Sequence, residues 1–312
     1  MKTSLAGIVL LAGLLCVPSR APAARSPDPF KTYSADGRAP LKELYRGMDL
    51  LAAGKDWVME TVFVDQGLPV RVLRSKRKGP AVWVLAGIHG EEPAPPNAVL
   101  QSRARLDALA RNGIPIVVFP LCNPVGYAKG WRYPDAARAP GHSVGDSDHL
   151  LFGAEGKPRA PKAASAQADA LTAKVLKLAK DYPPVLSLDL HEDDELEAGY
   201  LYSQGPKGRS DPAAAAVVAR MRELGIPVMG SGKTRFGEAV ENGVIADVSD
   251  GSIDELIAST AAFAGKTPAR GPSGRSVLVV ETSSKGRPLA ERIRAHSEVL
   301  ILIPELFRLA GR

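Results

Sequence analysis

The sequence predicts one α/β domain with a mixed, mostly parallel twisted central sheet flanked by helices. Continuous apolar runs at residues 81–86, 114–121, 185–190 and 276–281 have the length and composition of buried strands. Segments with helical spacing of apolar residues lie between these runs, and strands that alternate with helices are typical of α/β folds. The chain has 312 residues, of which 45% are hydrophobic and 24% charged, as in a soluble globular protein with a sizeable core.

The other elements follow in order along the chain. Residues 25–56 are mixed in composition and contain proline, and we expect them to form a surface lead-in to a domain over residues 57–312. Residues 57–64 and 69–74 predict a hairpin joined at Gly67. Helices are expected over 97–111, 168–180, 211–224, 253–264 and 288–309, and a short strand near 226–229. Residues 122–167 predict a long loop, and such loops often carry function.

The first 24 residues predict a secretory signal peptide. A lysine precedes the apolar run of residues 5–17, and small residues follow up to Ala24, where we expect cleavage. Lipidation at Cys16 and a buried N-terminal helix are the alternatives. The apolar run is too short to span a bilayer as a mature helix, so we expect a periplasmic or extracellular protein without stable membrane association after cleavage.

Cysteine and charge narrow the class of protein further. Only Cys122 remains after cleavage, so no intrachain disulfide can form, and its place after an apolar strand predicts a buried, inert thiol. Basic residues are scattered, except for a cluster from Arg71 to Lys78 that we interpret as a solvated strand edge. Because no basic stripe with interleaved aromatic residues is present, we expect no nucleic-acid partner.

Three segments place a histidine or a carboxylate where a predicted strand ends. They are GIHGEEP at residues 87–93, DLHEDD at 189–194 and VVETSS at 279–284. Ligands of open α/β sheets bind at the carboxyl ends of the strands. Three separate segments that converge on one such edge predict a site there.

The residue types in these segments suit a metal. His89 and Glu92 are three apart in a loop that Gly90 can turn tightly, and His191 would be a third ligand. Two histidines and one glutamate, with water in the fourth position, form a known catalytic zinc set. Zinc lowers the pKa of its bound water to about 7 and polarises a substrate carbonyl. Glu281 is then the candidate general base.

The ordered motifs resemble the zinc carboxypeptidase superfamily. HxxE at residues 89–92, NPxG at 123–126, DLHE at 189–192 and the strand-end Glu281 carry this resemblance. The superfamily includes carboxypeptidase A-like enzymes and the succinylglutamate desuccinylase/aspartoacylase deacylases. The resemblance runs from about Trp57 to the C-terminus. It implies a catalytic domain with one zinc ion per chain on His89, Glu92 and His191, and Glu281 as general base.

The resemblance also suggests supporting residues. Arg132 lies shortly after NPVG, where the family places an arginine that polarises the scissile carbonyl, and Arg138 is the alternative. Asp146 matches the first residue of the family's DxNR signature, whose aspartate orients a zinc-bound histidine. Asp189 is a rival for that role, because it precedes His191 by two residues and would point to the same strand face.

The sequence departs from the family pattern at two places. Asp148 and His149 stand where DxNR has the asparagine and arginine that clamp a terminal carboxylate, and no tyrosine follows Tyr202 to match the family's late tyrosine. We take Asp148, His149 and Arg132 as candidate substrate-binding residues. An acidic Asp148 would suit an amine-bearing peptide, such as a cell-wall peptide with a diamino acid. An N-acyl amino acid is the alternative substrate.

Rival functions rest on weaker patterns. GHSVG at residues 141–145 matches the nucleophile elbow around Ser143, but that motif needs a strand before it and a helix after it. VMGSGKT at 228–234 lacks the first glycine of a phosphate-binding loop, since Pro227 stands there. A binding module that kept the fold and lost activity is the non-enzymatic alternative.

Several charged residues near the motifs are expected to face solvent. We expect Glu91 to be exposed, because Glu92 has the family spacing. The acidic run from Glu192 to Glu195 predicts a loop that is partly solvated, and His296 is expected on a helix surface.

Overall fold

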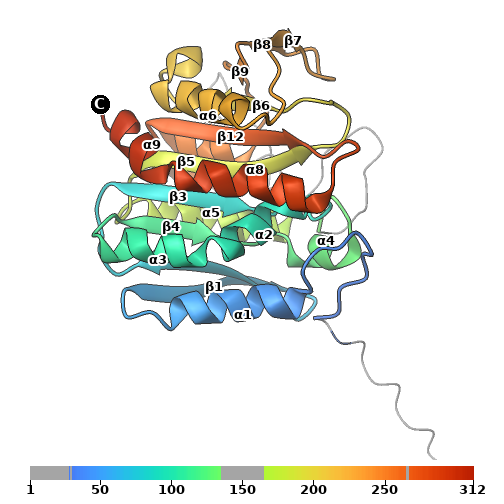
Figure 1. Cartoon of the computed structure of the whole chain (residues 1–312). Helices are drawn as coiled ribbons and strands as arrows, with labels where there is room; N and C mark the ends of the chain where they lie inside the picture. Colours follow the sequence, from blue (N-terminus) through green and yellow to red (C-terminus); the bar gives the residue numbers. More distant parts are fainter. Residues whose placement is uncertain (1–27, 29, 135–164, 265–266) are drawn as a thin grey trace, which may run out of the picture.

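The computed structural model describes residue 28 and residues 30–134, 165–264 and 267–312 (Figure 1). Within these residues a ten-stranded sheet has the order β1-β2-β4-β3-β5-β12-β6-β9-β8-β7, and helices cover both of its faces. The predicted single α/β domain with a mixed central sheet is confirmed. The predicted signal peptide lies outside the described residues. In the part of the chain that is described, no helix is long and apolar enough to cross a membrane.

The four central strands β4, β3, β5 and β12 are mutually parallel, and antiparallel strands flank them on both sides. The predicted hairpin is present, and Gln66 and Gly67 form its turn with φ of 47° and 82°. The strands of the large sheet are β1 (Trp57–Asp65), β2 (Leu68–Ser75), β3 (Ala81–Ala86), β4 (Ile116–Phe119), β5 (Pro184–Asp193), β6 (Tyr200–Ser203), β7 (Ser231–Lys233), β8 (Ala239–Glu241), β9 (Val244–Ile245) and β12 (Ser276–Ser283). A separate small sheet pairs β10 (Ala261–Ala264) with β11 (Thr267–Arg270).

Two apolar layers cover the sheet, one on each face. The alternation along β3 shows the division, because Val82 and Val84 join one cluster while Trp83 and Leu85 join the other. The first layer is built from α1 (Leu41–Ala52), α2 (Ala94–Gln101), α3 (Arg103–Arg111), α6 (Pro212–Glu223), α8 (Leu289–Ile301) and α9 (Ile303–Ala310). The second is built from α5 (Ala166–Leu178) and α7 (Ile253–Ala258). The short helix α4 (Pro124–Lys129) adds Val125, Tyr127 and Ala128 to the first layer, and η1 (Gly208–Ser210) is a short 3-10 helix.

The expected surface lead-in is wrong over α1. Leu41, Leu44, Tyr45, Met48 and Leu51 line one stripe of this helix and are all buried in the first apolar layer. Helix α1, which precedes the predicted domain start at residue 57, therefore packs into the core.

Several predicted elements differ in length. The helix expected over 288–309 is two helices, because Pro304 has no amide hydrogen to donate within a continuous helix and instead lies in the first turn of α9. The helix expected over 97–111 breaks at Ser102 into α2 and α3. The helix expected over 253–264 ends at Ala258, since β10 pairs with β11. The strand near 226–229 is only an isolated bridge from Val228 to Gly199.

The strand order of the sheet reverses at β3. The neighbours of β3 are β4 on one side and β5 on the other, so the chain leaves β3 toward one edge of the sheet and returns on the opposite side. Such a reversal of strand order opens a crevice at the carboxyl ends of parallel strands. The predicted strand-end motifs lie at this edge.

Candidate metal centre

The loop that carries His89 and Glu92 is held in a tight packing arrangement. Gly87 follows β3 with a φ of 67°, which turns the chain out of the sheet. Gly90 then lies directly against the backbone of Gly126 and Tyr127 in α4. Its amide donates to the carbonyl of Arg132 at 3.1 Å. The HxxE and NPxG motifs are therefore in contact through glycine backbone.

Two polar side chains tie these segments together. Asn123 caps α4 by accepting from the amide of Gly126 at 2.8 Å, and its Nδ2 donates to the carbonyl of Arg132 at 3.1 Å. The buried Arg38 donates from one nitrogen, Nη1, to the carbonyls of Gly90 and Tyr127, both at 2.7 Å. The long-loop prediction for 122–167 missed α4, which these contacts place beside the loop of His89 and Glu92.

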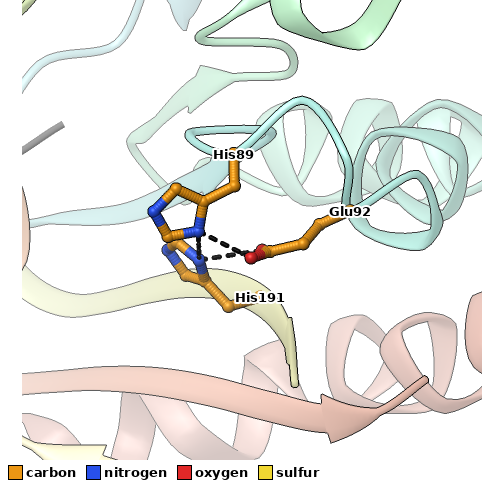
Figure 2. A group of neighbouring side chains, drawn as sticks. All are labelled: His89, Glu92 and His191. Atoms are coloured by element: carbon orange, nitrogen blue, oxygen red, sulfur yellow. Dashed lines mark hydrogen bonds and ion pairs between the residues drawn. The ribbon is translucent and has the colours of Figure 1, made fainter. Parts of the chain in front are cut away.

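The structure brings His89, Glu92 and His191 together (Figure 2). Nδ1 of His89 lies 2.6 Å from Oε1 of Glu92, and Nδ1 of His191 lies 3.0 Å from Oε2 of the same carboxylate. The two Nδ1 atoms are 3.1 Å apart. All three side chains are buried, and two imidazole nitrogens and a carboxylate that converge on one point form a donor set suited to zinc.

Asp189 lies behind His191. Its Oδ1 is 3.3 Å from Nε2 of His191, the ring nitrogen that faces away from Glu92, and the aspartate is only 1% exposed. A carboxylate in this place fixes the orientation of an imidazole so that its other nitrogen faces the metal position. Of the two predicted rivals for this role, the structure places Asp189 beside a histidine of the cluster.

The charges of the cluster depend on one another. Burial favours the neutral form of His191, but the negative charges of Asp189 and Glu92 outweigh this effect and raise its pKa well above the usual value. Burial would likewise raise the pKa of Glu92, yet the positive charges of His89 and His191 hold it well below the ordinary value. The buried cluster thus favours an ionised Glu92 with positive charge beside it. Protons on the histidines or a divalent metal ion can supply that positive charge.

Glu281 lies next to the cluster on the same face of the sheet. It pairs with His191 across β12 and β5, and with Tyr200 on its other side. Its removal from water raises its pKa to about 7, and the negative charges of Glu92 and Asp193 add to the effect, while the two histidines oppose it. A half-buried carboxyl with a pKa near neutrality is suited to exchange protons during a reaction.

Arg132 reaches the ligand set from the end of the α4 segment. Its Nη1 lies 3.2 Å from Oε1 of Glu92 and 3.3 Å from Oε1 of Glu91. Glu91 is therefore half-buried and ion-paired, and the expectation that it would be exposed is wrong. The guanidinium is placed to meet a negative group that enters beside the metal position.

The acidic run after His191 is more buried than expected. β5 continues to Asp193, so Glu192 and Asp193 are strand residues with 5% and 9% exposure, while the predicted solvated character holds for Asp194 and Glu195. Asp193 accepts from the hydroxyl of Tyr200 at 2.8 Å. Burial raises the pKa of Glu192 to about 7, against the charge of Arg292 beside it.

His296 is also buried rather than on a helix surface. It is 0% exposed, because α8 lays this side against β12, and its Nε2 is 2.9 Å from Oγ1 of Thr282. Burial lowers the pKa of His296 to about 3, and the positive charge of His191 contributes. Whether His296 is buried depends on which strand packs against α8, and the sequence around His296 does not reveal that strand.

Other predicted residues lie outside the described part of the chain. They are Asp146, Asp148, His149, Arg138 and Ser143. Cys122 is buried with no disulfide, and burial together with the charge of Asp189 raises its pKa well above the usual value. Sequence reasoning did not identify Arg38, Arg292 or Tyr200, whose hydroxyl donates to Asp193.

Comparisons with known proteins identify the fold. No protein-family model and no curated protein sequence matches the chain. Among solved structures, a protein from Shewanella baltica identified as a candidate metallopeptidase matches with a TM-score of 0.70 at 19% identity, covering 91% of this chain and 100% of its own. A second candidate metallopeptidase, from Shewanella amazonensis, has a TM-score of 0.67 at 22% identity and covers 84% of this chain and 91% of its own.

Carboxypeptidases are similar at greater distance. Carboxypeptidase A from Helicoverpa armigera matches with a TM-score of 0.58 at 13% identity, covering 89% of this chain and 75% of its own. The predicted resemblance to the zinc carboxypeptidase superfamily is thus confirmed at the level of fold: the chain has the α/β fold of the metallocarboxypeptidases.

Proposed function

We propose that this protein is a zinc-dependent metallopeptidase of the carboxypeptidase type, with His89, Glu92 and His191 as metal ligands. The observation that carries the proposal is the convergence of these three donor atoms at the carboxyl edge of a metallocarboxypeptidase-like sheet. Glu281 stands beside His191 in the adjacent strand, where a general base is required.

The roles of the surrounding residues follow from their places. Zinc, when bound, polarises the scissile carbonyl and lowers the pKa of water. Glu281 takes a proton from the water whose oxygen attacks the carbonyl carbon, and it returns that proton to the amine nitrogen as the C–N bond breaks. Arg132 donates N–H groups to the oxygen that gains negative charge. Asp189 keeps Nδ1 of His191 turned toward the metal position.

We further propose that the substrate is a peptide of the cell wall, which the protein meets after export. The signal-peptide pattern of the first 24 residues supports export, and Asp148 in place of a clamping asparagine supports an amine-bearing substrate. An N-acyl amino acid is the alternative within the same chemistry. No nucleic acid is required for either reaction.

The test is a substrate panel applied to three forms of the chain from residue 25 onward. The panel contains peptides with free and with amidated C-termini, peptides with a diamino acid, and N-acyl amino acids. We expect Glu281→Gln to lower kcat/KM by about 10² to 10⁴ while zinc remains bound. Ser143→Ala is expected to leave cleavage unchanged.

Each alternative has its own outcome. Loss of cleavage in the Ser143→Ala variant, with full activity in Glu281→Gln, would replace the proposal by a serine hydrolase. Turnover of N-acyl amino acids alone would favour the deacylase. A zinc-loaded protein that binds peptides and cleaves none would be the binding module.

A further inference from the structure

The metal ligands come from two segments that the sheet does not hold together at the site. His89 and Glu92 follow β3, and His191 lies near the end of β5. The pairing between β3 and β5 ends at Ala86 and Leu190. Beyond that point no ladder between these two strands fixes the separation of the ligands, and metal affinity depends on this separation.

A reciprocal pair of hydrogen bonds joins the two segments. The amide of Glu192 donates to Oε2 of Glu92 at 3.1 Å, and the amide of Ala94 donates to Oε2 of Glu192 at 2.9 Å. Each segment thus provides one amide and one carboxylate to the other. Ala94 is the first residue of α2, and no side chain at the N-cap position of this helix accepts from its first amides. Glu192, on strand β5, accepts from the Ala94 amide instead.

Glu192 does not face the metal position itself. Side chains alternate along β5, so His191 points to the face of α5 and α7, while Glu192 points to the face of α2 and α8. On that face Nη1 of Arg292, from α8, donates to Oε1 of Glu192 at 2.7 Å. The side chains of Glu192 and Arg292 are only 1% and 12% exposed.

We propose that Glu192, held by Arg292, is a positioning residue that fixes the His89–Glu92 loop relative to His191 and thereby sets metal affinity. The inference rests on the metal site of the proposed function. Both oxygens of Glu192 have a partner, one in α2 and one in α8, so the end of β5 is held by two helices at once. Removal of the charge leaves Arg292 buried without its counter-ion, and this guanidinium then has to move toward water.

The experiment compares Glu192→Gln with Glu60→Gln in the chain from residue 25 onward. Glu60 also joins separate elements through two cations, at 2.8 Å to Arg74 and 2.7 Å to Lys174, but it lies on β1, away from the metal-binding strands. The first readout is the dissociation constant for zinc, measured by competition with a chelator. The second is amide hydrogen exchange of residues 89–101 in metal-free protein.

We expect Glu192→Gln to weaken zinc binding by about 10- to 100-fold, as outer partners of metal ligands do, and to speed exchange in residues 89–101. Glu60→Gln should leave zinc affinity within about twofold, although it lowers stability. Wild-type zinc affinity in a folded Glu192→Gln variant would overturn the proposal. Equal weakening in both variants would also overturn it, since the effect would then be general.

Two further outcomes are distinguishable. If Glu192→Gln does not fold, the double variant Glu192→Gln/Arg292→Gln, which buries no unpaired charge, takes its place with the same expected loss of affinity. If the wild-type chain binds no zinc, the proposed function fails, whereas the exchange comparison still decides the positioning role. Unchanged exchange over residues 89–101 would then overturn that role.

Discussion

Gly90→Ala is expected to abolish tight metal binding without touching a ligand. A Cβ on Gly90 would lie 2.0 Å from the carbonyl carbon of Gly126 and 2.2 Å from the amide nitrogen of Tyr127. These are backbone atoms, which cannot rotate away as the end of a side chain can. The variant therefore has to separate the loop of His89 and Glu92 from α4.

The size of the separation follows from contact distances. Carbon atoms pack at about 3.5 Å, so the two segments have to move apart by about 1.5 Å at the point of contact with Gly126. Metal–ligand distances tolerate only about 0.2 Å, and His89 is the immediate neighbour of Gly90. We expect at least about 100-fold weaker zinc binding and a loss of about 3 kcal/mol in the free energy of unfolding.

Gly230→Ala is the matched control. No atom lies within 4 Å of a Cβ at Gly230, and its φ is not positive. We expect its zinc affinity to equal that of the wild type and its stability to change by less than about 1 kcal/mol. Zinc competition titrations and urea denaturation measure both quantities. A Gly90→Ala variant that binds zinc as tightly as the Gly230→Ala variant would refute the packing of the two motif loops.

Two further predictions concern buried groups. His296 has a pKa of about 3 in the folded chain against 6.5 unfolded, so its contribution is complete above pH 6.5 and is lost as the pH falls toward 3. Between pH 6.5 and 4.5 this loss is about 2 kcal/mol, because the unfolded imidazole is only half protonated at pH 6.5 and the slope approaches 1.36 kcal/mol per pH unit below it. Urea denaturation of the metal-free protein should show it, and His296→Gln should remove that part of the pH dependence; an unchanged pH dependence would contradict the burial. Cys122 should react with a thiol reagent only after denaturant is added, since burial raises its pKa and covers it, and rapid labelling of the native chain from residue 25 onward would count against this.

The centre of the fold could be predicted because its signal is local. Buried parallel strands are continuous apolar runs, so residues 81–86 and 185–190 could be predicted as strands from the sequence. The polar residues that follow these runs lie at one edge of the sheet. The stripe of α1 was also present in the sequence, at Leu41, Leu44, Tyr45 and Met48, but the proline-containing surroundings concealed it.

The residues that surround the candidate metal ligands could not be predicted in the same way. Glu192 and His296 are polar residues on elements that look amphipathic, and their burial depends on partners about 100 and 14 residues away in the chain, Arg292 and Thr282. The spacing of apolar residues along a helix or strand does not indicate such distant partners. Asp189 was accessible to sequence reasoning because it is two residues from His191 on a strand, and side chains two apart share a face.

The metal content of the purified protein tests the central claim most directly. Plasma mass spectrometry would be applied to the chain from residue 25 onward, beside a His89→Ala/His191→Ala double variant. We predict about one zinc per chain in the wild type and none in the double variant, because the variant keeps only Glu92 of the cluster. No metal in either protein, and no uptake of added zinc, would contradict the assignment of His89, Glu92 and His191 as a metal site.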